Sequence, residues 1–157
     1  MRRTDREITD AREIARIMSR CRVASIAFGG DTPYVVPMNF GFSCEDGHFC
    51  LYLHCAGEGE KMRSVRSDPR AAFSMFTDET LLTAGIACGH TMDFESVCGS
   101  GRIEALAGED KRYGLSRLMA QLAPGREWTF DERMLRAVTV LRLDVETISG
   151  KRHATAR

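Results

Sequence analysis

A histidine, two glycines and a lysine follow one another closely between Leu51 and Lys61, where the sequence reads LYLHCAGEGEK. The apolar run that ends at His54 is typical of a strand, and Lys61 lies where a helical pattern begins. A loop between a strand and a helix start exposes backbone N–H groups at the positive end of the helix dipole, which favours anion binding. Gly57 and Gly59 allow a ligand to approach the backbone closely. The segment therefore predicts an anion site, with Lys61 as a phosphate contact.

Each of these residues also has an ordinary structural interpretation. Most lysines are solvated surface residues, and Glu58 and Glu60 would repel a phosphate if they pointed toward it. A histidine at a strand end is commonly a core or edge side chain. As a ligand contact, His54 would exchange hydrogen bonds with a polar ring, since imidazoles gain and lose protons near neutral pH.

Other candidate contacts lie on extended segments and in one loop. Pro37 interrupts the run from Tyr34 to Phe42, which favours a bulge or an edge strand because proline has no ladder donor. The unpaired backbone of Val36–Asn39 could face a planar heterocycle, or it could be an ordinary edge strand protected by proline. Ser96 is a small residue on a long strand. Trp128, the only tryptophan, could stack on a ligand or lie in a subunit contact.

Length and composition limit the classes of function. A chain of 157 residues predicts a single domain, here 1–157 with 152–157 as a frayed tail. The 22 basic and 22 acidic residues cancel, which predicts no nucleic-acid or membrane partner. The sequence has no membrane-spanning run and no apolar signal core, so a cytoplasmic location is expected. Six cysteines without a C-x-x-C pair are expected to be reduced thiols, and no metal site is predicted.

The elements that must position these residues are mainly strands. A helix is expected after Asp10, where apolar residues recur every three or four positions. Six strands in hairpin order with few helices between them predict an antiparallel barrel or sandwich with helices packed outside. The predicted strands are 23–28, 34–42, 48–54, 71–77, 91–106 and 138–145, the further helices are 61–66, 109–122 and 131–137, and 78–91 is a loop or irregular strand.

Motifs of several enzyme classes are absent from the sequence. It contains no nucleophile elbow, no phosphate-binding Walker loop, no dinucleotide-binding glycine fingerprint and no H-E-x-x-H. Hydrolase and nucleotide-kinase functions therefore have no residues to carry them. A redox cofactor would supply chemistry that these side chains cannot.

Three segments taken together resemble the flavin-binding split-barrel family of pyridoxamine 5′-phosphate oxidase, and most of all its nitroimidazole-resistance (nitroimidazole reductase) branch. They are PYVVPMNFGF at 33–42, LYLHCAGEGEK at 51–61 with Asp68-Pro69, and SVCGSGRI at 96–103 with AGED at 107–110. The closing ISGK at 148–151 fits the same pattern. The similarity runs in collinear order from about residue 5 to 151.

The resemblance implies a mainly β protein with flanking helices, a six-stranded antiparallel split β-barrel that forms a homodimer with FMN at the subunit interface. It implies that Lys61 binds the flavin phosphate and that His54 is the polar residue beside the ring. It further implies that Trp128 or Lys151 comes from the partner subunit. The implied cofactor contacts are Val36, Pro37, Met38, Asn39, His54, Cys55, Gly59, Lys61, Ser96, Val97, Trp128 and Lys151.

The sequence departs from the oxidase branch in two places. Oxidases usually carry Ser-Arg-Lys where this chain has Gly59-Glu60-Lys61, so Arg63 or Lys151 must replace the missing arginine. The chain also lacks the tryptophan- and arginine-bearing C-terminal segment that the oxidase uses. Both departures argue against vitamin B6 oxidation.

The expected function is an FMN-dependent oxidoreductase that reduces a small aromatic or nitro compound, with NADH or NADPH as a possible electron donor. The alternative is a flavin- or haem-binding module without a catalytic cycle, with His54 or His90 as the axial haem ligand. A third possibility is a structural dimer that binds no cofactor.

Overall fold

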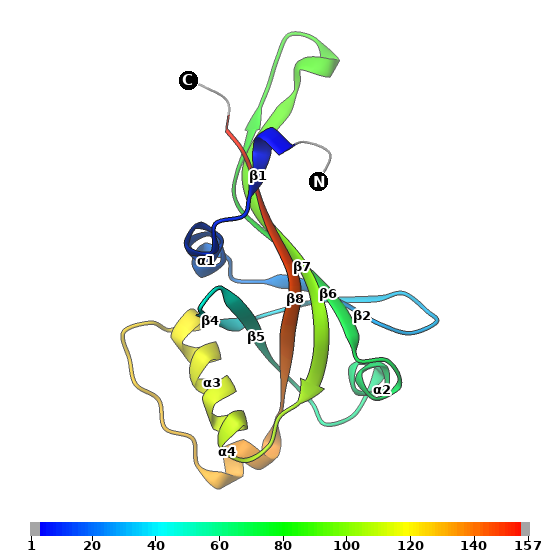
Figure 1. The fold of residues 1–157 in the computed structure, drawn as a ribbon, viewed down its shortest axis with the longest axis vertical. Coiled ribbons are helices and arrows are strands. Elements are labelled where there is room, and N and C mark those ends of the chain that lie inside the picture. The colour runs from blue at the N-terminus through cyan, green and yellow to red at the C-terminus, as the bar shows by residue number, and fades with distance from the viewer. Residues whose placement is uncertain (1–3, 155–157) are drawn as a thin grey trace.

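The computed structural model describes residues 4–154 as one antiparallel β-sheet with helices packed around it (Figure 1). The strand order is β3-β2-β6-β7-β8-β5-β4, and β1 pairs with β8 outside this path. The strands are β1 (Glu7–Ile8), β2 (Ala24–Phe28), β3 (Tyr34–Met38), β4 (Gly41–Glu45), β5 (His48–Cys55), β6 (Arg70–Leu82), β7 (Thr91–Ala105) and β8 (Thr139–His153).

Four α-helices flank this sheet in the described chain. The first begins where the sequence predicts, because the Asp10 side chain accepts a hydrogen bond from the Glu13 N–H at 2.9 Å. Its apolar face packs on the sheet core, while α3 covers β4 and β5. The helices are α1 (Ala11–Arg20), α2 (Glu60–Ser67), α3 (Gly108–Leu122) and α4 (Glu132–Ala137), and short 3₁₀ turns lie at Thr4–Arg6 and Ala87–Gly89.

The predicted fold class is confirmed, but the described chain has eight strands rather than six. The predicted strand 34–42 is two strands, because β3 pairs with β2 whereas β4 pairs with β5. Pro37 lies in β3 at the edge of the sheet, as its missing donor requires. The eighth strand is β1, which the sequence pattern did not indicate; it adds Glu7 and Ile8 to the edge of β8.

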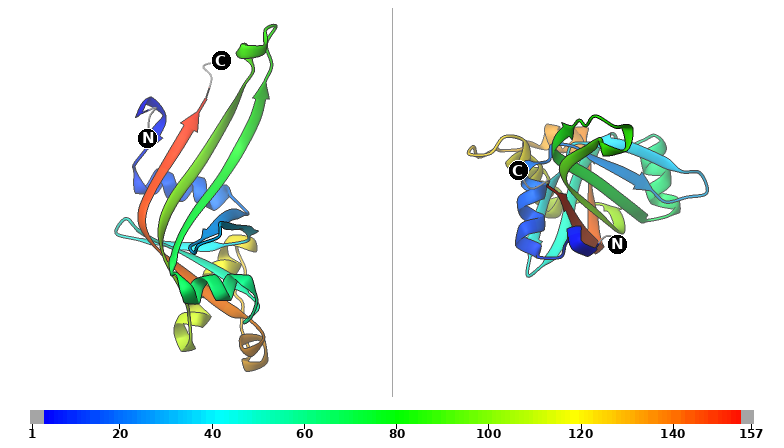
Figure 2. Two further views of the ribbon diagram at one scale, coloured as in Figure 1. Left: turned by 90° about the vertical axis from the view of Figure 1, so that its right-hand side faces the viewer. Right: turned by 90° about the horizontal axis from the view of Figure 1, so that it is seen from above.

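The β6–β7 hairpin projects at one end of the molecule, opposite α3 and α4 (Figures 1 and 2). Part of the segment 78–91, predicted as a loop or irregular strand, is strand, since β6 continues to Leu82 and β7 begins at Thr91. The register shifts between Thr77 and Thr80, where Asp78 has a φ of 58°. This bulge explains why the alternating pattern is lost there.

The last strand is also longer than predicted. Arg152 and His153 belong to β8 and pair with β7, so the strand runs into the segment predicted as a frayed tail. Residues 155–157 of that tail lie outside the described residues. No helix in residues 4–154 is long and apolar enough to cross a membrane.

Candidate functional site

The segment from His54 to Lys61 has the strand–loop–helix form that the sequence predicts. His54 is exposed near the end of β5, whereas Cys55 points into the core with its sulfur 3.9 Å from that of Met62. Burial raises the pKa of the Cys55 thiol, and the nearby charge of Lys61 opposes this without reversing it. Cys55 can therefore offer a ligand its backbone, while its thiol stays protonated in the core.

The start of α2 is open to an anion. Gly59 caps the helix with a φ of 106° and makes no side-chain cap bond, so the first N–H groups are not covered by a side chain. A Cβ at Gly59 would meet nothing within 4 Å, so its conformation, not crowding, selects glycine. Arg63 pairs with Glu60, whereas Lys61 has no ion-pair partner among residues 4–154. Arg63 thereby balances the charge of Glu60, and the charge of Lys61 is left for a ligand.

The strand β3 presents its two faces differently. Pro37 is exposed and lies opposite Ser25 of β2, while Met38 is buried in the core. The side chain of Asn39 is held by the segment before β2, since its N–H donates to the Arg22 carbonyl at 3.0 Å. The half-buried Val36 also packs against the core. Of these four residues, Pro37 and Asn39 are exposed, and the Asn39 side chain is already engaged with Arg22.

The residues on the long strands divide in the same way. Val97 is fully buried, so its side chain belongs to the core. Ser96 is half-buried on the outer face, between Lys151 of β8 and Phe76 of β6. The Lys151 Nζ lies 5.3 Å from the centre of the Phe94 ring. Phe76 is 63% exposed, which is unusual for a phenylalanine on a central strand.

One chain does not bring all these residues together. His54 pairs with Val140 near the start of β8, whereas Lys151 lies at the far end of the same strand. The eleven residue steps between them span about 35 Å of extended chain. Trp128 lies in the loop before α4, with the Arg126 guanidinium 4.3 Å from its ring centre. The candidates therefore form separate groups on one subunit.

An outer surface of small side chains connects the middle of β2, β6, β7 and β8. Its side chains are small and exposed or half-exposed: Ser25, Ala27, Ala72, Ser74, Cys98, Ser100, Thr147 and Ser149. We call this set the small-residue face. Its members bond mainly to one another, for example Ser100 Oγ to Thr147 Oγ1 at 2.8 Å. Sequence reasoning missed this surface, although small residues alternate along each of these strands.

A group of oppositely charged side chains connects α1 to the first part of β7 and the last part of β8. Glu95 is buried and pairs with Arg16 at 2.7 Å, with Arg20 at 3.2 Å and with Arg152. Burial acts to raise the pKa of Glu95, but hydrogen bonds from Arg152 and Arg16 outweigh it and the pKa is lowered. Hydrogen bonds from Arg16 and Arg152 also lower the pKa of Glu13, to about 2. The sequence gives no sign of this cluster, because its members come from separate elements.

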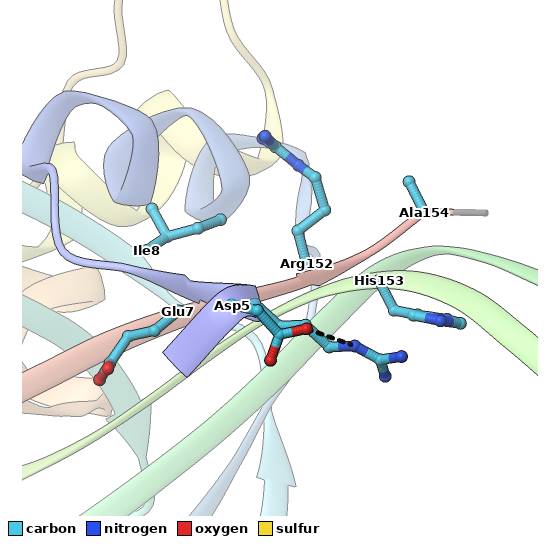
Figure 3. A pocket seen from close by; sticks show the side chains of 7 residues that line it. Asp5, Glu7, Ile8, Arg152, His153 and Ala154 are labelled. Carbon is cyan, nitrogen blue, oxygen red and sulfur yellow. Dashed lines mark ion pairs between the residues drawn. The ribbon is translucent and has the colours of Figure 1, made fainter. Parts of the chain in front are cut away.

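A hollow of about 430 Å³ lies beside this cluster, between the N-terminal segment and the end of β8 (Figure 3). Asp5, Glu7, Arg152 and His153 line it, and Asp5 pairs with Arg6 at 3.9 Å. Its charges of both signs are close to balance. The hollow therefore has no clear preference for an anion or a cation.

Comparisons with known proteins identify the family and the fold. A family model described as pyridoxamine 5′-phosphate oxidase matches residues 10–152. A candidate 5-nitroimidazole antibiotic resistance protein from Bacteroides thetaiotaomicron is 26% identical, with a TM-score of 0.78 over 92% of this chain and 85% of that one.

Two further structures share the fold. A FAD- and haem-binding protein from Mycobacterium smegmatis has a TM-score of 0.82 at 21% identity, covering 96% of this chain and 74% of that one. A flavocytochrome from Azotobacter vinelandii has a TM-score of 0.80 at 21% identity, covering 99% and 72%. Among curated proteins, none matches the chain.

Proposed function

Because the chain belongs to the pyridoxamine 5′-phosphate oxidase family, we propose that it is an FMN-dependent oxidoreductase that reduces a small aromatic or nitro compound. The observation that carries the proposal is the family match over residues 10–152, which includes every candidate contact from Val36 to Lys151. The 26% identical nitroimidazole-resistance candidate supports the nitro-reducing branch.

The start of α2 fits the phosphate of FMN. It offers N–H groups that no capping side chain covers, a glycine with positive φ, and Lys61, which has no ion-pair partner among residues 4–154. This chain lacks the arginine that the oxidase branch places beside the lysine and has Glu60 there instead. Because Arg63 forms an ion pair with Glu60, the Glu60 carboxylate would repel the phosphate less. Hydrogen bonds from Lys61 and the helix N–H groups to a phosphate would be charge-assisted, and such bonds are stronger than those between neutral groups.

The flavin ring needs a flat surface, which the exposed parts of β3 and the small-residue face offer. His54 pairs with Val140, which about 35 Å of extended β8 separates from Lys151 and its neighbour Ser96, so one subunit does not bring these contacts to the same end of the strand. A homodimer that pairs the small-residue faces in antiparallel fashion would bring the Lys61 end of one chain toward the Lys151 end of its partner. The proposal therefore includes a homodimer, with Lys151 and Trp128 contributed by the partner.

Bound FMN would supply electron and hydride transfer between a reduced nicotinamide and the substrate. The chain itself would bind and orient the ring through the β3 backbone and Ser96. His54 is the exposed imidazole nearest in sequence to the phosphate segment, and it would hold or donate a proton to the substrate at Nδ1 or Nε2. No residue need act covalently.

The test is FMN binding by the purified protein, followed by anaerobic reduction with NADH or NADPH and addition of a nitroimidazole. Lys61→Gln should weaken FMN binding about 10- to 100-fold, as expected for one lost charge-assisted hydrogen bond. Arg63→Gln is the matched control, because Arg63 is already paired with Glu60, and it should change the affinity much less. Absence of FMN binding by the wild type would rule the proposal out.

A haem- or flavin-binding module is the second candidate, because two structures of this fold are described as binding haem as well as FAD or as a flavocytochrome. Two exposed histidines could serve as axial ligand: His54, and His90, whose Nδ1 lies 3.2 Å from the Ile86 carbonyl. A Soret band that forms on haem addition, is lost in His54→Ala and is kept in His90→Ala would identify His54 as the axial ligand. If the protein binds neither flavin nor haem, the third possibility, a structural dimer without a cofactor, is favoured.

A further inference from the structure

Three side chains able to bind a transition metal meet on the outer face of β5 and β8. His48 and Cys50 are two residues apart on β5, so they share one face, and Asp144 pairs directly with Cys50. One ligand atom from each residue lies within 4.8 Å of the other two. The His48 Nε2 and Asp144 Oδ1 atoms are 2.7 Å apart. Along β5, Cys50 lies about 13 Å and His48 about 20 Å from His54.

We propose that His48, Cys50 and Asp144 form a binding site for a divalent transition metal, with Zn²⁺ as the expected ion. The donor set of nitrogen, sulfur and oxygen suits Zn²⁺ and other borderline-soft ions better than Mg²⁺ or Ca²⁺. A neutral imidazole with one thiolate and one carboxylate carries two negative charges, which the ion would balance. Three protein ligands leave a fourth position for water or another ligand.

The exposure of the group leaves that fourth position accessible. The side chains of His48 and Asp144 are 58% and 47% exposed, while Cys50 is half-buried between them and the sheet. In the strand register Arg102 of β7 lies opposite Asp144 and Glu45 of β4 lies opposite His48, so charges of both signs border the site. An ion can reach all three ligands from solvent without any strand moving.

The surroundings of Cys50 favour a thiolate only when a cation is present. Burial raises the pKa of the Cys50 thiol and the charge of Asp144 raises it further, whereas Arg142 and a hydrogen bond from Tyr52 lower it. The thiol is therefore protonated in the free protein, and metal binding must release that proton. Arg142 has a buried Nε–H without a partner in the described chain, and an anionic sulfur nearby would stabilise it.

The simpler interpretation is a surface hydrogen bond between His48 and Asp144 with an uninvolved cysteine beside it. The two interpretations differ in the sulfur. A metal site needs Cys50 as a ligand, whereas a hydrogen-bonded pair does not. The sequence shows neither, because a His-x-Cys pair is no chelate on its own and Asp144 comes from another strand.

The test uses Co²⁺ as a spectroscopic substitute for Zn²⁺ in the full-length reduced protein, with any co-purifying flavin kept in place. We expect one equivalent of Co²⁺ to give a thiolate-to-cobalt band in the near-UV difference spectrum. Ligand-field bands should also appear at wavelengths longer than those of flavin. Zn²⁺ should displace both sets of bands, and the affinity should rise with pH because the thiol must lose its proton.

Two variants and a matched control distinguish the interpretations. Cys50→Ser should lose the thiolate band, and His48→Gln, at an exposed position, should weaken binding at least about tenfold. Cys44→Ser changes an exposed cysteine on the neighbouring strand and should leave the spectrum unchanged. A wild type without a thiolate band overturns the proposal. So does a band that survives in Cys50→Ser, or one that disappears in Cys44→Ser.

Discussion

At the scale of single residues, sequence and structure agree where a function depends on neighbours along the chain. His54, Gly59 and Lys61 lie within eight residues, so their order alone predicts a strand end, a glycine turn and a cation at a helix start. Glu95 is the opposite case. Its partners come from α1 and β8, and no spacing in the sequence connects them.

Glu95 supplies a prediction about stability. Glu95→Gln should lower the free energy of unfolding by about 2 kcal/mol at neutral pH, since it removes hydrogen bonds between charged groups and leaves Arg16 and Arg152 without their buried carboxylate. Urea unfolding measures the loss. Glu104→Gln is the control, because its pair with Arg142 is at the surface and should contribute less than about 1 kcal/mol. Equal losses in the two variants would contradict this role of Glu95.

The pH dependence of this effect has a definite sign. The pKa of Glu95 is lowered in the folded protein, so its contribution is present above the ordinary carboxylate pKa and is lost as pH falls through the folded value. Glu13 follows the same rule, with its contribution lost between its ordinary pKa of 4.5 and about 2. The difference between wild type and Glu95→Gln should therefore shrink in acid.

At the scale of elements, helices were more predictable than the lengths of strands. The Asp10 cap and the apolar rhythm after it locate α1, because both signals are local. Strand ends depend instead on pairing with distant strands. For this reason the sequence pattern predicted β3 and β4 as one strand, did not indicate β1 and ended β8 too early, although it predicted the hairpin order.

The contact between α3 and β4 supplies a prediction at this scale. A Cβ at Gly41 would lie 2.3 Å from the Arg117 carbonyl oxygen of α3, and backbone atoms cannot move aside as a side chain can. Gly41→Ala should therefore destabilise the protein by about 1–3 kcal/mol or more. Thermal unfolding checks this against Gly85→Ala, where a Cβ meets nothing within 4 Å. A Gly41→Ala protein as stable as Gly85→Ala would show that α3 packs less closely than this.

At the scale of the whole molecule, the proposed homodimer would bring together candidate contacts that one chain holds in separate groups. His54 pairs near the start of β8 and Lys151 lies near its end, while Thr147 and Ser149 of the small-residue face lie between these two positions on the strand. The sequence suggested the dimer through family resemblance, but it could not indicate which surface pairs. The structure supplies a candidate surface, because exposed small side chains allow two sheets to approach closely while Phe76 and Val35 remain to be covered.

This surface leads to a prediction that separates folding from assembly. Ser74 is exposed at the centre of the small-residue face, so Ser74→Arg should fold normally yet block the pairing of two sheets through its bulk and charge. Light scattering after size exclusion should then show a dimer for the wild type and a monomer for Ser74→Arg. FMN binding should weaken together with assembly, because the Lys151 end of the partner would be lost.

Ser19→Arg makes the same substitution on the exposed last turn of α1, away from the small-residue face, and should remain a dimer that binds FMN. If Ser74→Arg stays dimeric, the subunits pair through another surface. If it becomes monomeric but binds FMN as tightly as the wild type, the cofactor site is complete within one chain. In that case Lys151 would have no part in the site from across a subunit interface.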